Sequence, residues 1–229
     1  EMTSSLVGSE MCIRDRLCRM PECLISTYQD NMPLAAELKA DFEWAKSIAV
    51  GPGLSMNVAA AEITRCVLER DDKVRILDAD ALNIIAGEHI DYKGSREGQI
   101  IITPHIMEMS RLTGKTVADI KEHMIESAKE YAIQHSCICI LKDARTVVTD
   151  GQKVYINCTG NDGMSTGGCG DVLTGLIAGM TAMGLDAFEA ACLSVYVHGK
   201  AGDYAASGKG RAGMTAADIS EAIAYVLKR

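Results

Sequence analysis

The 229-residue sequence has few aromatic side chains, no basic block and no long apolar run. Only seven Tyr, two Phe and one Trp occur beside 21 Gly and 12 Met, so a large core has to be built from aliphatic residues and methionine. No apolar stretch approaches the roughly 18 residues of a membrane span. The net charge is -8, and without a basic stripe we expect neither nucleic acid nor a membrane as a partner.

The nine cysteines form no CxxC pair and no Cys/His cluster with the spacing of zinc ligands. Cys137 and Cys139 alternate within a short apolar run, which puts both on one face of a strand. Buried free thiols are typical of a reducing compartment, and no apolar signal-peptide segment is evident near the N-terminus. We therefore expect a cytoplasmic protein.

Hydrophobic residues make up 48% and charged residues 24% of the chain, a balance typical of a globular domain. Residues 1–16 have no helical or strand period, and their stretch SLVGSEMCIRDR resembles a translated sequencing-adaptor read. We interpret residues 1–16 as a non-native or disordered tail; the alternative is a genuine flexible terminus. Residues 17–229 contain no linker and no internal repeat, which predicts a single domain.

Short apolar runs alternate with amphipathic stretches through the rest of the chain. Strands are predicted at 47–50, 74–77, 99–102 and 137–141, and an Asp150-Gly151 hairpin turn follows. Helices are predicted at 57–69, 105–113, 117–134, 171–183, 187–206 and 215–228. In the first helix Asn57 is the expected cap, with Val58, Ala60, Ala61 and Val67 on the inner face. Strands separated by helices predict a mostly parallel sheet flanked by helices.

Distinctive turns follow four of the predicted strands: GPG after Val50, DAD after Leu77, TPH after Ile102 and KDART after Leu141. A glycine-rich run follows the predicted hairpin. Ligands of open parallel sheets bind beyond the carboxyl ends of the strands. The sequence therefore predicts one ligand site at that end of the sheet.

The glycine-rich run Asn161–Gly170 leads directly into Asp171 and a helix. Its glycines allow backbone amides to approach an anion, and the positive end of the helix adds to that attraction. We expect the helix terminus to keep Asp171 ionised, so that it can act as a base toward a hydroxyl. The glycine-rich run is not a Walker loop, since no Gly-Lys-Ser/Thr follows it. Taken alone, the run is equally compatible with Asp171 as a simple helix cap.

The longer string GMSTGGCGDVLTGLIAGM resembles the signature of the NAD(P)H-hydrate dehydratases, a family of the ribokinase-like superfamily. GPGLS, DADALN, TPHIMEMSRL and KDART match the same family in the same order, and the similarity continues to the C-terminus. The resemblance implies a three-layer α/β/α sandwich with a mostly parallel central sheet. It also implies repair of hydrated NADH or NADPH, in which ADP or ATP phosphorylates the added hydroxyl and phosphate then leaves. Mg²⁺ would bridge the nucleotide phosphates, and the protein would form a homotetramer.

The resemblance also assigns roles to individual residues. It implies that Asp171 is the catalytic base and that Gly168 and Gly170 form the anion hole. The nucleotide would be bound by Lys142, Asp143, Ala144, Arg145, Thr146, Asn161, Gly163, Met164, Ser165, Thr166, Gly167, Gly168, Cys169 and Gly170. The hydrated dinucleotide would be bound by Gly53, His105, Glu108, Arg111 and Asp171. Asp78, Asp80 and Asn83 would lie along the same edge, and no residue identifies itself as a metal ligand.

Each of these residues also has a purely structural interpretation. His105 could cap a helix, Glu108 could be a solvated acid in a first helical turn, and Asp78 could be a turn or cap residue. His198 lies in an apolar helix and is expected to be a packed core histidine. The remaining histidines, His89, His123 and His135, are expected at the surface.

Three positions depart from the family pattern: Asp143 replaces a usual Gly, Asp162 a usual Pro and Cys169 a usual Thr. Because a helix N-terminus lowers the pKa of a thiol, we expect Cys169 to be reactive.

Family members also have a further N-terminal strand and helix before the point where the resemblance begins. We therefore expect a truncated chain that is poorly soluble or inactive alone. Two other functions remain open: a ribokinase-like kinase of a thiazole or pyrimidine alcohol in vitamin synthesis, and a nucleotide-binding protein without turnover.

Overall fold

The computed structural model describes residues 34–95 and 99–228, so the predictions for residues 1–16 lie outside the described residues. Six strands form one sheet in chain order. They are β1 (Ser47–Val50), β2 (Val74–Leu77), β3 (Ile100–Ile102), β4 (Ile138–Leu141), β5 (Val147–Thr149) and β6 (Val154–Ile156). The first four strands are parallel to one another, β5 pairs antiparallel with β4, and β6 pairs antiparallel with β5. The predicted parallel strands and the Asp150-Gly151 hairpin are confirmed.

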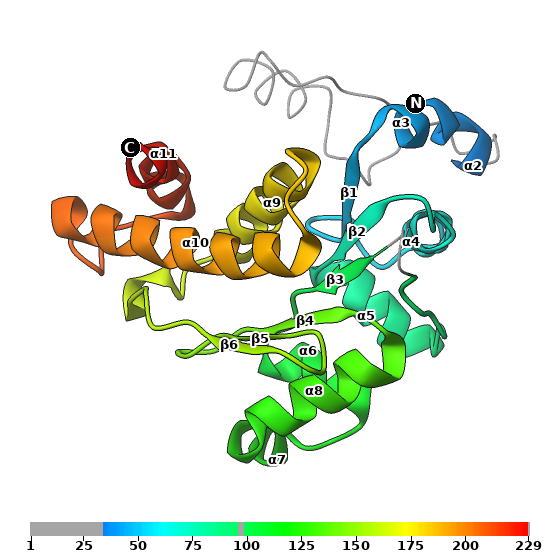
Figure 1. Ribbon diagram of the computed structural model, residues 1–229, viewed down its shortest axis with the longest axis horizontal. Coiled ribbons are helices and arrows are strands. Elements are labelled where there is room, and N and C mark those ends of the chain that lie inside the picture. Colours follow the sequence, from blue (N-terminus) through cyan, green and yellow to red (C-terminus); the bar gives the residue numbers. More distant parts are fainter. Residues whose placement is uncertain (1–33, 96–98, 229) are drawn as a thin grey trace.

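Helices cover both faces of the sheet, which confirms the three-layer sandwich (Figure 1). One layer contains α4 (Val58–Leu68), α5 (Ala79–Glu88), α6 (Ile106–Thr113), α7 (Val117–Glu122) and α8 (Met124–His135). The other contains α9 (Cys169–Ala182) and α10 (Ala187–Lys209), and α11 (Ala216–Leu227) packs against α10. Two short helices, α2 (Leu34–Glu37) and α3 (Lys39–Trp44), precede β1, and a 3₁₀ turn, η1 (Asp162–Met164), precedes α9.

The parallel strands are buried on both faces because helices pack on each side. Leu77, Ile102 and Leu141 belong to the core under α4–α8. Their neighbours Ile76 and Ile101 belong to the core under α9 and α10. This alternation follows from the two-residue period of a strand. Polar groups can then lie beyond the carboxyl ends of the strands, outside these two cores.

Two helix predictions are wrong in detail. The helix predicted at 117–134 is two helices, because His123 at φ -125°, ψ 48° interrupts them. Both segments still bury one face, with Ile120 and Ala128 fully enclosed. Asn57 caps α4 as predicted, but Val58 is 85% exposed. Val58 and the buried Val67 are nine positions apart, which puts them on opposite faces of a helix with 3.6 residues per turn.

The histidine predictions are confirmed for exposed His89 and His123 and for buried His198. His135 is a correction, because it is half-buried instead of lying at the surface. Its ring stacks on Tyr92 and Tyr131, with centroid distances of 4.7 and 4.3 Å. The prediction failed because the sequence around His135 is polar, whereas two tyrosines brought there by the fold cover its ring.

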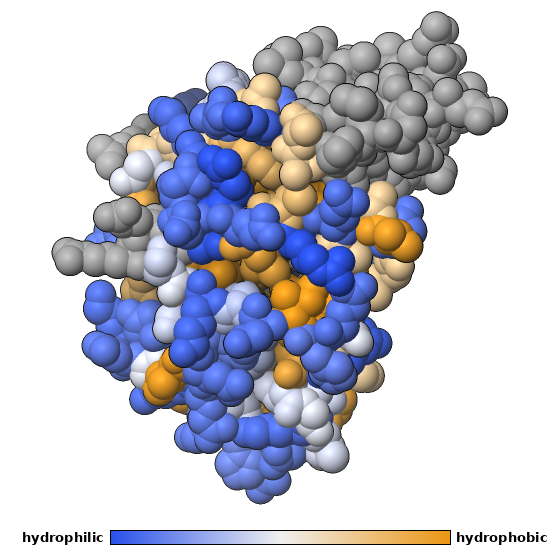
Figure 2. Space-filling view, turned by 90° about the vertical axis from the view of Figure 1, so that its right-hand side faces the viewer, coloured by the Kyte–Doolittle hydropathy of each residue, from blue (hydrophilic) through white to orange (hydrophobic). Residues whose placement is uncertain are grey.

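On the face shown in Figure 2, hydrophilic residues surround a smaller apolar area near the centre. None of the helices in the described ranges is both long enough and apolar enough to cross a bilayer.

Candidate functional site

The turn after β1 packs closely against the start of α5. Gly51 has φ +122°, and a Cβ at this position would lie 1.7 Å from the Asp78 carbonyl oxygen. Only glycine therefore allows this approach. Gly53 also has a positive φ, of +65°, but a Cβ there would meet nothing within 4 Å. The GPG turn after β1 thus packs against Asp78, the residue that follows β2, while the space around Gly53 is open.

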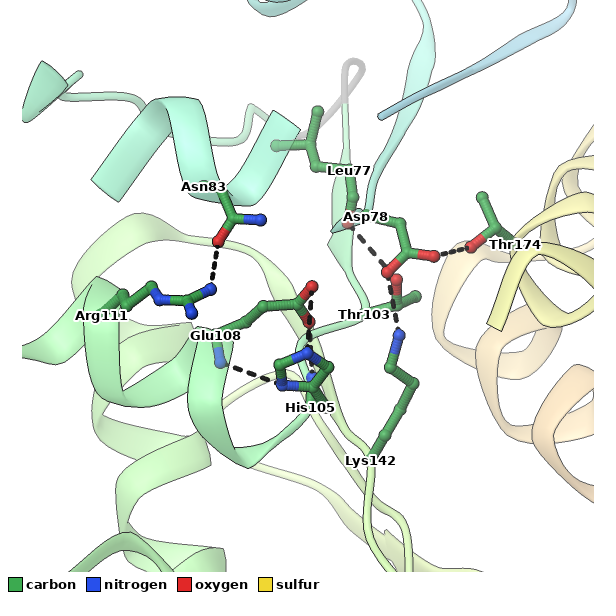
Figure 3. A network of polar contacts seen from close by, with 9 residues as sticks. All are labelled: Leu77, Asp78, Asn83, Thr103, His105, Glu108, Arg111, Lys142 and Thr174. Atoms are coloured by element: carbon green, nitrogen blue, oxygen red, sulfur yellow. Dashed lines mark hydrogen bonds and ion pairs between the residues drawn. The ribbon is translucent and has the colours of Figure 1, made fainter. Parts of the chain in front are cut away.

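Asp78 is a buried carboxylate that connects three elements of the fold. It directly follows β2 and is 1% exposed. Its Oδ1 accepts a hydrogen bond of 2.9 Å from Lys142 Nζ, and its Oδ2 accepts one of 2.7 Å from Thr174 Oγ1 (Figure 3). It occupies the N-cap position of α5 but makes no capping hydrogen bond with its side chain. Asp78 is therefore a turn and N-cap residue by position, and its carbonyl oxygen accepts a hydrogen bond from the Ala81 amide at 3.1 Å, but its side chain bonds Lys142 and Thr174 instead of capping the helix.

The charge of Asp78 is stabilised by its partners. Burial alone would raise the pKa of this carboxyl group, but Lys142 and hydrogen bonds from Thr174 and Thr103 hold the pKa below its usual value. A buried carboxylate held ionised in this way fixes the Lys142 ammonium at the end of β4.

Asp171 lies in the first turn of α9, next to this ion pair. A Cβ on Gly170 would lie 3.4 Å from Lys142 Nζ and 3.8 Å from Asp78 Oδ2. Burial raises the pKa of the Asp171 carboxyl group, Asp78 and Asp80 raise it further, and Lys142 opposes them. The shift is opposite to the lowering of the pKa that a helix terminus alone would cause, because burial first, and the two carboxylates second, raise it. A raised pKa makes Asp171 a stronger proton acceptor once it is ionised.

The start of α9 presents backbone amides without a side-chain cap. Its N-cap is Gly168, at φ +87°, and makes no side-chain hydrogen bond. The amides of a first helical turn lack partners within the helix, and the helix dipole favours negative charge there. This geometry is suited to an anion such as a phosphate.

His105 and Glu108 form a reciprocal cap at the start of α6. His105 Nδ1 accepts a hydrogen bond from the Glu108 amide at 3.0 Å, and Glu108 Oε2 accepts one from the His105 amide at 2.8 Å. The capping interpretation of His105 is confirmed. Glu108 is 5% exposed, so its interpretation as a solvated acid is wrong. Burial raises the pKa of Glu108, while the His105 backbone hydrogen bond and the positive charge of Lys142 oppose the rise.

Further polar contacts extend this edge toward α5. Arg111 donates a hydrogen bond of 2.7 Å from a guanidinium nitrogen to Asn83 Oδ1 (Figure 3). The Ser55 amide donates one of 2.8 Å to Asp80 Oδ2. The predicted edge residues Asp80 and Asn83 therefore hold groups from the neighbouring turn and helix.

A cavity of about 1030 Å³ opens beside Lys142. Its lining includes these predicted nucleotide residues: Lys142, Asp143, Ala144, Arg145, Thr146, Asn161, Met164, Ser165, Thr166, Cys169 and Gly170. The predicted residues Gly163, Gly167 and Gly168 do not line it. Of the predicted substrate residues only His105 lines the cavity, whereas Gly53, Glu108, Arg111 and Asp171 do not.

The cavity has lining residues that the sequence analysis missed. They are Asn157, Thr159, Gly160, Leu173, Val195, His198, Gly199 and Arg211, whereas the lining residue Asp162 belongs to the glycine-rich run that was expected to surround the phosphates. The polar run after β6 offered a signal for the first three, because it directly precedes the glycine-rich segment. Val195, His198 and Gly199 lie on α10, where an apolar pattern gives no means of telling a cavity wall from a core.

The three residues that depart from the family pattern, Asp143, Asp162 and Cys169, have different surroundings. Asp162 is paired with Arg211 at 3.2 Å, and Asp143 lies exposed in the cavity lining. Cys169 is buried, and burial raises the pKa of its thiol. The predicted lowering of this pKa is therefore wrong, because desolvation of the thiolate outweighs its position at the start of α9.

Comparison with known proteins gives consistent matches. A family model described as NAD(P)H-hydrate dehydratase matches residues 7–225. A bifunctional NAD(P)H-hydrate repair enzyme of Moorella thermoacetica is 45% identical over 183 residues, which cover 79% of this chain and 34% of that protein. An ADP-dependent (S)-NAD(P)H-hydrate dehydratase of Neisseria meningitidis is 33% identical over 215 residues, covering 92% of this chain and 72% of that protein. The chain thus spans about a third of the length of the bifunctional relatives it matches.

Solved structures agree with these relatives. An ADP/ATP-dependent NAD(P)H-hydrate dehydratase of Bacillus subtilis, co-crystallised with ATP and Mg²⁺ and soaked with CoA, has a TM-score of 0.79 at 30% identity. The match covers 97% of this chain and 81% of that one. A hydroxyethylthiazole kinase of Pyrococcus horikoshii has a TM-score of 0.64 at 14% identity, which is a likeness of fold alone.

Proposed function

The chain belongs to the NAD(P)H-hydrate dehydratase family, and on that premise we propose that it restores NADH and NADPH from their hydrated forms. The phosphoryl donor would be ADP or ATP, as in the similar proteins named for these nucleotides. Transfer of a phosphoryl group to the added hydroxyl would be followed by loss of phosphate. The protein would therefore act as a lyase that consumes a nucleotide.

One structural observation supports this proposal most strongly. Asp171 stands at the start of α9, beside the Lys142–Asp78 ion pair and next to a cavity of about 1030 Å³. Such a volume is in the range of pockets that enclose small-molecule ligands. A base, a cation and the start of a helix are thus close together, as transfer of a phosphoryl group to a hydroxyl requires.

Each residue of the site would have a separate role in phosphoryl transfer. Asp171 would accept the proton of the hydrate hydroxyl, whose oxygen then forms a bond to the terminal phosphorus of the nucleotide as the bond to the leaving phosphate oxygen breaks. Lys142 and the amides of Gly168 and Gly170 would bind the phosphoryl oxygens. The carbon–oxygen bond then breaks and phosphate departs with the hydroxyl oxygen and the bonding electron pair, while the neighbouring ring carbon loses a proton to water and the electrons of that C–H bond form the double bond.

Asp78 would support this step without touching substrate. Its buried carboxylate fixes the Lys142 ammonium, while Thr174 fixes the carboxylate. On the other side of Lys142, His105, Glu108 and Arg111 would bind the hydrated dinucleotide, with Gly53 allowing its close approach. Loss of this ion pair should then weaken nucleotide binding as well as the fold.

The protein's side chains fit Mg²⁺ only when phosphate oxygens of the nucleotide also bind the ion. Among residues 34–95 and 99–228, no group of three or more His, Cys, Asp or Glu side chains could hold a metal ion. Mg²⁺ commonly binds through phosphates, water and one or two carboxylates. Both oxygens of Asp78 are engaged. Asp171 at the start of α9 and the exposed Asp143 of the cavity lining would be carboxylates available to the ion, which would supply charge neutralisation at the phosphates.

We extend the proposal to a cytoplasmic homotetramer without nucleic-acid or membrane partners. The family resemblance supports the tetramer, and the net charge of -8 supports the absence of nucleic acid. Light scattering of the purified chain tests the assembly.

The direct test supplies hydrated NADH with ADP or with ATP and follows the absorbance of the reduced nicotinamide. We expect its appearance to match nucleotide consumption one for one and to disappear in Asp171→Asn. Nucleotide binding without turnover, or phosphorylation of a thiazole or pyrimidine alcohol when it is supplied in place of hydrated NADH, would contradict the proposal.

A further inference from the structure

The segment of residues 210–215, between α10 and α11, packs along the glycine-rich run. A Cβ on Gly163 would lie 2.4 Å from the carbonyl oxygen of Arg211. Nearer the end of the run, a Cβ on Gly168 would lie 3.2 Å from the Cβ of Ala216, the first residue of α11. The segment therefore follows the run from η1 to the N-cap of α9.

Arg211 is the basic residue of this segment. It lines the cavity, and so does Asp162 of η1. A guanidinium nitrogen of Arg211 lies 3.2 Å from Asp162 Oδ1, and the two side chains are 68% and 78% exposed. An exposed ion pair of this kind contributes little to stability. Another anion in the cavity can therefore replace the carboxylate at small cost to the fold.

Lys142 lies at the other end of the glycine-rich run. A Cβ on Gly170 would lie 3.4 Å from Lys142 Nζ, and Asp171 follows directly. In the proposed function the transferred phosphate is bound here. Lys142 and Arg211 line the same cavity, so the next phosphate of the nucleotide is left for the second cation. The remaining arginine of the lining, Arg145, belongs to the turn after β4 and not to the segment that packs on the run.

We propose that Arg211 binds the phosphate that stays with the nucleoside, and that Asp162 competes with this phosphate for the guanidinium. A guanidinium suits the group, because its planar donors can bind two phosphate oxygens at once. With ADP as donor this is the α-phosphate, whose bridging oxygen gains negative charge as its bond to the transferred phosphorus breaks. This inference rests on the proposed nucleotide site and adds a residue at the end away from Asp171.

Two arginine variants of the full chain test the contact. Arg211→Gln removes the charge and retains much of the side-chain length. Arg70→Gln is the matched control, because Arg70 also pairs with an aspartate, Asp72, at 3.0 Å, but precedes β2 at the amino end of the strands. We expect Arg211→Gln to melt like the wild type and to bind ADP on the order of tenfold more weakly, the effect of one hydrogen bond to a charged group. The control should bind ADP like the wild type.

A series of ligands locates the contact along the nucleotide. AMP retains the α-phosphate, so its affinity should fall in Arg211→Gln by a factor similar to that for ADP. Adenosine has no phosphate and, measured by competition with ADP, should bind both proteins equally. An equal loss for adenosine would place the guanidinium at the base or ribose, and a loss for ADP alone would place it at the transferred phosphate. Either result would overturn the inference.

Asp162→Asn tests the competition. Without the carboxylate the guanidinium is released, so ADP should bind a few-fold more tightly, within the range of an exposed ion pair. The gain should be smaller when Arg211→Gln is also present, because no guanidinium is left to release. Equal gains in the two backgrounds would show that Asp162 acts on the phosphate directly, and would contradict the competition.

Turnover gives a measurement that a purely structural role would not change selectively. In Arg211→Gln, kcat with ADP should fall as well as the affinity, because the charge on the leaving oxygen grows during transfer. Equal ADP affinity in the wild type and Arg211→Gln would overturn the inference and leave the proposed function intact. A wild-type chain that binds neither ADP nor ATP would instead contradict the proposed function, and this inference with it.

Discussion

Lys142 Nζ lies 2.9 Å from Asp78 Oδ1, although the two residues are 64 positions apart in the sequence. Asp78 follows β2 and Lys142 follows β4, so the contact spans the carboxyl ends of the parallel strands. Thr174 of α9 joins the same carboxylate. The ion pair therefore connects the sheet to the helix that begins beside Asp171.

Replacing Asp78 should destabilise the protein strongly. Asp78→Asn leaves a largely buried ammonium without its counter-charge, which costs on the order of 3 kcal/mol. Asp72→Asn breaks the exposed pair with Arg70 and should cost less than about 1 kcal/mol. Urea unfolding of both variants measures the difference, and equal losses would contradict the role of Asp78.

The pKa of Asp78 is lower in the folded protein than in the unfolded chain. The stability that its ionised form contributes should therefore be present above the pKa of the unfolded chain and disappear as the pH falls through the pKa of the folded protein.

The pH dependence of turnover should reveal the base. Burial and the charge of Asp78 raise the pKa of Asp171 above the ordinary value of an aspartate, so kcat/KM should rise with pH through that higher pKa. Asp80→Asn removes one raising charge and should shift the acid limb to lower pH. Asp171→Asn should reduce the rate by about 10²–10⁴-fold. An acid limb that does not move in Asp80→Asn would argue against Asp171 as the titrating base.

Two glycines of the same turn provide a matched comparison. Gly51→Ala would force a Cβ to within 1.7 Å of the Asp78 carbonyl oxygen, whereas Gly53→Ala would meet open space. Both have a positive φ, which costs roughly 1–2 kcal/mol for an alanine. Gly51→Ala should therefore lose on the order of 2 kcal/mol more than Gly53→Ala. Thermal or urea unfolding tests the order, and similar losses would show that the turn is not held against α5.

Acid should weaken the fold through His198. Burial lowers its pKa to about 4 in the folded protein, against about 6.5 for an exposed histidine. Between these values the unfolded chain binds more protons, so stability should fall as the pH falls from about 6.5 to about 4. The full difference is on the order of 3 kcal/mol. The slope should be smaller in His198→Asn, which cannot titrate, and an unchanged slope would contradict the buried neutral ring.

Local patterns predicted much of the fold and only part of the site. The β-strands, the Asp150-Gly151 turn and the Asn57 cap depend on neighbouring residues, which is why the sequence predicts them. The Asp78–Lys142 pair depends on which strands become neighbours, a property of the whole sheet. The cavity wall formed by Val195, His198 and Gly199 was missed because a small, apolar helix face can pack equally well against a core or a ligand. Cys169 was misjudged because burial of a side chain is not visible in its local sequence.

The central claim is that the hydroxyl of the hydrate is phosphorylated before it leaves. Hydrated NADH prepared in heavy-oxygen water contains the label in that hydroxyl, so its fate can be followed by mass spectrometry after turnover with ADP or ATP. We predict that the label appears in inorganic phosphate, in step with the reduced nicotinamide that forms. Label released into water, with unlabelled phosphate, would contradict it.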